Sequence, residues 1–143
     1  MRCVGLIWTI GKQLRRDWAR QSLDCEYFAS ELITLEEVLL HFSLTQKEDT
    51  KPIPWTRSVA ALAAFLTFLF DRGIICKIGV QQICLHFVVR NKRGEWVHPT
   101  RQAYDKGVFE YREGGNTLPS IDMREFYRTL GFWPLPQITT EKT

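Results

Sequence analysis

Cysteine and histidine are the side chains of this sequence with most potential for nucleophilic or metal chemistry. Cys84 and His86 stand two residues apart, and on a strand they would share a face, where an imidazole can activate a thiolate. No third residue is spaced to orient that histidine. Cys76 and Cys84 are too far apart for the paired spacing of zinc sites. The sequence therefore predicts no metal, and Cys76 and Cys84 are expected to be ordinary buried thiols.

Other catalytic patterns are missing from the sequence. It has no phosphate-cradling glycine loop, no G-x-S-x-G turn and no helix with a metal-binding histidine pair. Three carboxylates, those of Glu95, Asp105 and Glu110, are scattered rather than convergent. His41 stands among apolar neighbours and is expected to be a core or rim histidine. We therefore expect a non-enzymatic protein without a cofactor.

Two local clusters of positive charge are the candidates for a binding surface. The net charge of +3 is too small to indicate a nucleic-acid partner without such clustering. One cluster lies on a predicted amphipathic helix over residues 12–23, and the other lies at the tip of a predicted hairpin. A solvated helix face and a merely soluble turn are the alternative interpretations. The candidate phosphate contacts are Arg90, Lys92 and Arg93 in the hairpin, and Arg15, Arg16 and Arg20 in the helix.

An apolar helix over about residues 56–72 is expected to form the centre of the core. Thr56 is placed to cap its first turn, and Gly73 suits a left-handed residue after its end. The uncharged run over residues 58–70 would be about 20 Å long, whereas a bilayer core is about 30 Å thick. No membrane segment is therefore expected, and a face left uncovered would be a dimer interface.

The remaining elements predict an α+β fold. In the N-terminal helical part, residues 1–44, the sequence Thr34–Glu37 matches a capping box and predicts a helix restart. A loop over 45–54 leads to the second part, residues 53–133. There, a β-hairpin or small antiparallel sheet is expected at about 75–112. Its strands are predicted at 83–89, 95–97 and 107–112, and a short C-terminal helix follows from about residue 120.

Length and composition are typical of one globular domain over residues 1–143. The chain is 45% hydrophobic and 24% charged, and aromatic residues make up 13%. The short apolar start lacks the cleavage site of a signal peptide. Free thiols and a cytoplasmic location are therefore expected.

Two patches of the sequence resemble the RteC family of regulators from Bacteroidetes mobile elements. The first is the W-T-x-S-x-x-x-L pattern that opens the apolar helix, from Trp55 to Leu62. The second is "IDMREFYRTL", which runs from an acidic residue into an F/Y-Y-R-T helix. Together they cover some 30 residues. The family joins them by a helical segment and continues with a basic run, whereas this chain has a stretch predicted to be strand-rich and then "GFWPLPQ".

The resemblance implies a regulatory protein that acts on DNA and is not an enzyme. Trp55, Thr56 and Phe126 would then be structural. The alternative is a protein interaction or assembly module, without nucleic-acid binding, that contacts a protein partner or a second copy through exposed aromatic residues. Its contact candidates are Trp96, Tyr104 and Tyr111.

Overall fold

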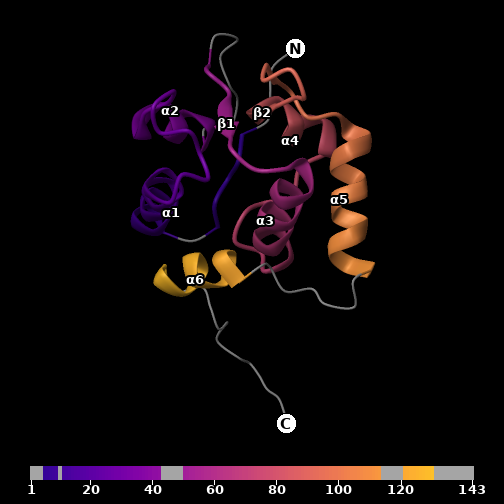
Figure 1. Ribbon diagram of the computed structural model, residues 1–143. Coiled ribbons are helices and arrows are strands. Elements are labelled where there is room, and N and C mark those ends of the chain that lie inside the picture. The colour runs from indigo at the N-terminus through magenta and orange to yellow at the C-terminus, as the bar shows by residue number, and fades with distance from the viewer. Residues whose placement is uncertain (1–4, 10, 43–49, 114–120, 131–143) are drawn as a thin grey trace.

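The computed structural model describes residues 5–9, 11–42, 50–113 and 121–130, and these form an α+β fold (Figure 1). Helices dominate, and a small mixed sheet lies among them. The elements in chain order are α1 (Lys12–Asp24), α2 (Leu35–Leu39), the 3-10 helix η1 (Leu40–Phe42), β1 (Ile53–Trp55), α3 (Val59–Asp71), α4 (Val80–His86), β2 (Phe87–Arg90), β3 (Trp96–Val97), α5 (Arg101–Glu113) and α6 (Ile121–Thr129).

The sheet has the order β1-β2-β3, and one of its two pairings was not predicted. β2 pairs with β3 antiparallel, as the predicted hairpin requires. β1 pairs with β2 in parallel, with Ile53 opposite Phe87. The sequence interpretation placed β1 in a loop, because its proline masks the strand pattern. Since parallel neighbours need a crossover connection, α3 and α4 lie between the two strands in the chain.

The central apolar helix is confirmed, although it begins later than predicted. α3 starts at Val59, and the Ser58 hydroxyl accepts the Ala61 N–H at 3.1 Å. Thr56, the predicted cap, instead donates its hydroxyl to the Glu26 carbonyl at 2.6 Å and so ties the start of this segment to the N-terminal part. Gly73 follows the helix with a φ of 70°. Among the described helices, none combines the length and the apolar character needed to cross a bilayer.

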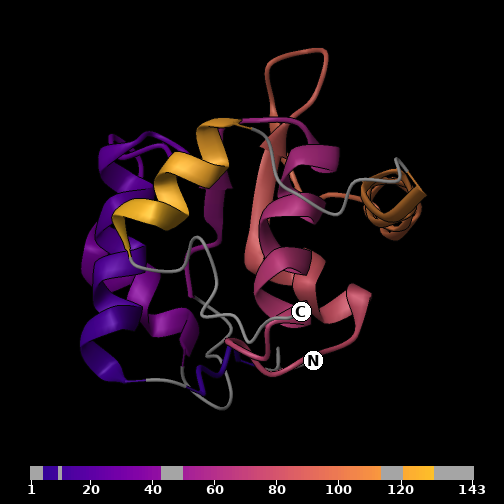
Figure 2. The ribbon, with the colours of Figure 1, turned by 90° about the horizontal axis from the view of Figure 1, so that it is seen from below.

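The predicted strand over 107–112 is wrong, because these residues belong to helix α5. The buried positions Tyr104, Gly107 and Tyr111 recur at helical spacing and face α3. α3 and α5 lie side by side, with α1 and α2 on the opposite flank (Figures 1 and 2). A Cβ placed on Gly107 would lie 2.8 Å from the Ala63 Cβ and 2.9 Å from the Ala60 Cα. The absence of a side chain is therefore what lets the two helices approach so closely.

The predicted strand over 83–89 is half wrong, since residues up to His86 are helical. α4 begins after Gly79 and buries Ile83, Cys84 and His86, and the chain becomes extended only at Phe87. Cys84 and His86 therefore do not lie on one strand face, and the basis for an activated thiolate is lost.

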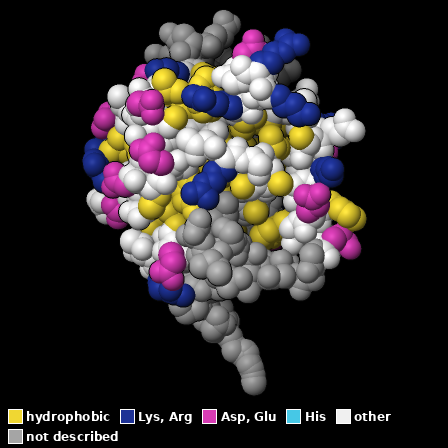
Figure 3. Space-filling model, in the orientation of Figure 1, with side chains coloured by type: hydrophobic (Ala, Val, Ile, Leu, Met, Phe, Trp, Pro, Cys, Tyr) yellow, Lys and Arg dark blue, Asp and Glu magenta, His cyan; other side chains and the backbone are white. Residues whose placement is uncertain are grey.

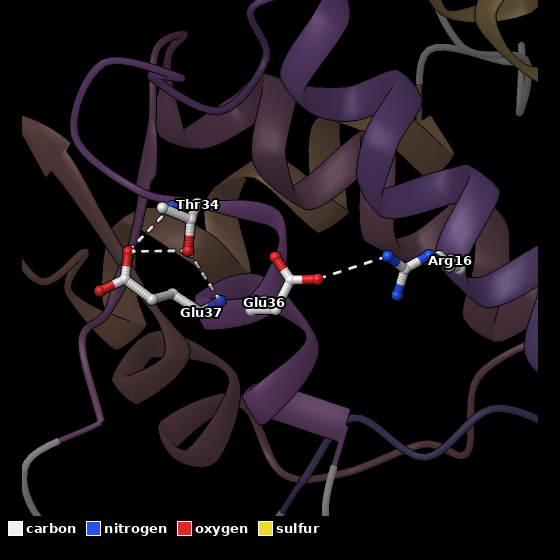
Figure 4. A network of polar contacts seen from close by, with 4 residues as sticks. All are labelled: Arg16, Thr34, Glu36 and Glu37. Carbon is white, nitrogen blue, oxygen red and sulfur yellow. Dashed lines mark hydrogen bonds and ion pairs between the residues drawn. The ribbon is translucent and has the colours of Figure 1, made fainter.

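Helix α1 and the helix start at Thr34 are confirmed in the N-terminal part. In α1, Trp18 and Ala19 are buried, while most of the helix's cations are exposed. The capping box at α2 is complete: Thr34 Oγ1 accepts the Glu37 N–H, and the Glu37 carboxylate accepts the Thr34 N–H (Figure 4). The Thr34 N–H and, to a smaller extent, the Thr34 hydroxyl donate to the Glu37 carboxylate and hold the pKa of Glu37 below its ordinary value.

Aromatic rings fill the core around Phe65 of α3. Its ring centroid lies 5.0 to 5.7 Å from those of five other aromatic side chains, and the side chain is fully buried. The predicted C-terminal helix is confirmed as α6, and its Tyr127 hydroxyl donates to the Phe65 carbonyl at 2.6 Å. Trp55 and Phe126 are buried, which agrees with a structural role. The rings around Phe65 are those of Trp18, Tyr27, Trp55, Phe126 and Tyr127.

Candidate nucleic-acid interface

The tip of the β2–β3 hairpin is a turn held by the Asn91 side chain. Asn91 Oδ1 accepts the backbone N–H groups of Arg93 at 2.9 Å and Glu95 at 3.0 Å. The Gly94 N–H closes the turn onto the Asn91 carbonyl at 3.0 Å, and Gly94 has a φ of 80° that suits glycine. The loop projects beyond the body of the fold (Figure 2). The turn thus fixes the backbone at the positions of the two predicted contacts, Lys92 and Arg93.

The three predicted hairpin cations differ in what they touch. Lys92 and Arg93 are exposed, and within the described residues neither forms an ion pair. Arg90 lies opposite Trp96 across the two strands, and its guanidinium carbon is 5.1 Å from the centroid of the Trp96 ring. The hairpin therefore combines two exposed cations that have no ion pair in the described part of the chain with a third, Arg90, that is ordered by an aromatic ring.

A shallow groove of about 380 Å³ lies against Trp96 on the outer face of the sheet. Phe87 and Val89 point into the core, so the alternate residues of β2 face outward. Leu32, from the turn before α2, contributes a side chain that is 39% exposed. We call this feature the Trp96 groove, and it is lined by Leu32, Lys51, Pro52, Pro54, Val88 and Trp96.

A second depression adjoins the groove and shares Leu32 and Trp96 with it. Arg90 lines this depression together with two carboxylates, those of Glu26 and Glu31. The two carboxylates disfavour an anion in this depression, and an anion is better placed toward the tip of the hairpin.

The predicted cations of α1 do not join the hairpin site. Arg16 forms an ion pair with Glu36 at 3.3 Å (Figure 4), and the Arg15 guanidinium lies 5.7 Å from the centroid of the Phe42 ring. Arg20 is exposed. None of the three lines the Trp96 groove or the depression beside it. Glu36 of α2 thus takes up part of the positive charge of α1.

Positive charge on the face seen in Figure 3 is dispersed. Lys and Arg side chains alternate there with acidic side chains and with patches of hydrophobic atoms. Among the described residues on that face, Figure 3 shows no continuous basic band of the kind that follows a duplex backbone.

Three sequence-based expectations about individual side chains are wrong. Tyr104 and Tyr111, predicted as exposed contacts, are buried against α3, and this burial raises the pKa of each phenol. Cys76, predicted to be buried, is exposed. Cys84 is buried as expected, and burial raises the pKa of its thiol, which disfavours the reactive thiolate. Within the described residues, no group of three or more histidine, cysteine or acidic side chains is arranged to hold a metal ion.

A buried pair of histidines was not predicted. His41 Nδ1 lies 2.7 Å from His86 Nδ1, and His41 Nε2 lies 2.7 Å from the Lys51 carbonyl oxygen. A carbonyl only accepts, so His41 Nε2 carries a proton and the Nδ1 of neutral His41 accepts the N–H of His86. This chain of bonds connects η1 to α4 and to Lys51, at the wall of the Trp96 groove.

Acid is expected to destabilise the protein through this pair. Burial lowers the pKa of His41 from its ordinary value of 6.5. Below about pH 6.5 the unfolded chain therefore binds a proton that the folded protein resists, and stability falls by up to about 1.4 kcal/mol per pH unit. Urea unfolding measured at a series of pH values tests this. His41→Gln should flatten the profile. An unchanged acid slope in His41→Gln would contradict the assignment.

Comparisons with protein-family models, with curated proteins and with solved structures found no match to this chain. The resemblance to the RteC family accordingly stays a prediction from the two sequence patches.

Proposed function

We propose that the protein is a non-enzymatic, DNA-associated regulator that binds the phosphate backbone through the β2–β3 hairpin. The observation that carries the proposal is the state of Lys92 and Arg93. Both side chains are exposed on a turn whose backbone is held by hydrogen bonds, and neither forms an ion pair within the described residues. Backbone contacts of this kind position a protein on DNA without reading its sequence. A role in a bacterial mobile element rests on the RteC resemblance alone.

The hairpin is better suited to phosphate than the basic helix. A cation binds phosphate most readily when it does not first have to break an ion pair or leave a packed position. Lys92 and Arg93 satisfy this condition. Arg16 would first have to leave Glu36. We therefore assign the principal contacts to the hairpin, with Arg90 held beside them by Trp96, and a secondary role to Arg20.

Replacement of both tip cations is expected to change the salt dependence of DNA binding. Each phosphate contact on duplex DNA contributes about −0.9 to the slope of log affinity against log salt, so Lys92→Ala/Arg93→Ala should reduce the slope by nearly two units. Fluorescence anisotropy with a labelled duplex from about 50 mM salt upward measures this slope. The matched control is Lys77→Ala/Lys106→Ala, which removes the same charge from exposed positions elsewhere.

Three outcomes would argue against the hairpin assignment. Equal slopes in the two double variants would mean that only net charge matters. Loss of binding in Arg16→Ala/Arg20→Ala alone would move the site to α1. An absence of binding at about 50 mM salt would remove the DNA function and leave the protein-interaction alternative. That alternative is favoured by one observation, the partly exposed apolar Trp96 groove.

A further inference from the structure

We infer that the Trp96 groove receives an unpaired base of single-stranded DNA while the neighbouring phosphates lie on the hairpin cations. The inference deepens the proposed function and rests on it. It predicts that the protein prefers single-stranded over duplex DNA, a preference that the exposed tip cations do not explain.

The lining of the Trp96 groove has the chemical character that suits a nucleobase. Apart from Lys51, the side chains are apolar or aromatic, and they come from three separate segments of the chain. Such a surface suits a flat ligand with an apolar face and a polar edge, and a nucleobase has both. Trp96 supplies the ring for stacking. Bases within a duplex are already paired and stacked, so only a single strand presents a free face to such a ring.

Positive charge borders the groove. Lys51 lies in its lining, and β2 and β3 lead from it directly to Lys92 and Arg93. Arg90 is held against Trp96 without a carboxylate partner in the described residues, and a stacked guanidinium keeps N–H donors for a phosphate. An aromatic slot bordered by cations selects an aromatic anion over a neutral apolar segment of a protein.

The charge around the site gives the strand a direction across it. Glu26 and Glu31 line the adjoining depression, which shares Leu32 and Trp96 with the groove. Their negative charge disfavours phosphate there, so the backbone should pass from the groove toward the tip of the hairpin. One stacked base with phosphates on one side of it is the arrangement that this charge distribution favours.

Substitution of Trp96 is expected to separate single-strand from duplex binding. Loss of one stacked base corresponds to about a 5- to 150-fold weaker affinity. Trp96→Ala should therefore bind a labelled oligothymidylate of about 12 nucleotides that much more weakly. Its duplex binding, which loses only the ordering of Arg90, should fall by a much smaller factor. Trp96→Phe keeps a stacking ring and should retain most of the affinity. Val97→Ala, at the neighbouring exposed position of β3, is the control.

The oligonucleotide itself provides an independent test. A strand of the same length with abasic sites in place of bases should bind the wild-type protein as weakly as the Trp96→Ala variant binds the intact strand. Circular dichroism of each variant checks that the fold is kept.

Several results would overturn the inference. One is an unchanged affinity of Trp96→Ala for the single strand, and another is an equal loss on single strand and duplex. A third is that thymidine monophosphate displaces the labelled strand as effectively as the unlabelled oligonucleotide does, which would indicate a binding site for free nucleotides. A fourth is a protein partner lost on Trp96→Ala without any DNA binding. If duplex binding depends on Lys92 and Arg93 while Trp96→Ala is silent, only this inference fails and the proposed function stands.

Discussion

Replacement of Phe65 by alanine is expected to destabilise the protein by about 3–5 kcal/mol. The side chain is fully buried, and its ring meets five others that come from α1, α6, β1 and the segment between α1 and α2. The cavity would therefore open where the N-terminal and C-terminal parts meet, and no single element can move to close it. Urea unfolding followed by far-UV circular dichroism measures the loss.

Phe109 of α5 is the matched control for this substitution. Its side chain is 63% exposed, so Phe109→Ala removes the same atoms without opening a cavity. A change within about 0.5 kcal/mol is expected. If the two variants lost similar stability, Phe65 would not be the centre of the core.

A β-branched side chain at Gly107 is expected to cost roughly 1–3 kcal/mol or more. The two atoms closest to a Cβ at this position belong to α3. They are the Cβ of Ala63, at 2.8 Å, and the Cα of Ala60, at 2.9 Å. The second is a backbone atom, so relief requires the two helices to separate along their contact. Thermal unfolding of Gly107→Val measures the effect.

The neighbouring residue Lys106 supplies the control for helix propensity. It is exposed on the same helix, so Lys106→Val introduces the same side chain without a clash. Gly107→Ala introduces the Cβ alone and should also lose stability. Adding Ala63→Gly to that variant removes the Ala63 Cβ, one of the two closest contacts, so the double variant should recover part of the lost stability. No difference between Gly107→Val and Lys106→Val would show that close approach of α3 and α5 does not matter for stability.

Local signals in the sequence were sufficient for about half of the elements. Helix α1 and the turn from Asn91 to Gly94 follow from patterns within a few residues, and so does the start of α2 at Thr34. The error in α5 came from reading its aromatic and β-branched residues as a strand. The spacing of Tyr104, Gly107 and Tyr111 already favoured a helix.

Features that depend on distant residues could not be predicted. β1 is a strand because it pairs with β2, and three residues containing a proline carry no strand pattern of their own. His41 and His86 belong to separate elements, and only the fold brings their rings together. The exposure of Lys92 and Arg93 could be predicted from the turn-forming residues around them. The groove beside them could not be predicted, because Leu32 reaches it from the distant N-terminal part of the chain.

The parallel pairing of β1 with β2 has a consequence for synthesis on the ribosome. α3 leaves the ribosome well before β2, so the pairing of β1 with β2 cannot form while α3 emerges. At about 5–20 residues per second, the interval between the end of α3 and the end of β2 lasts about 1–4 s. Helix α5, which packs against α3, follows later still. The nascent chain thus carries an exposed apolar helix for seconds, which makes α3 the segment where a chaperone would bind during translation.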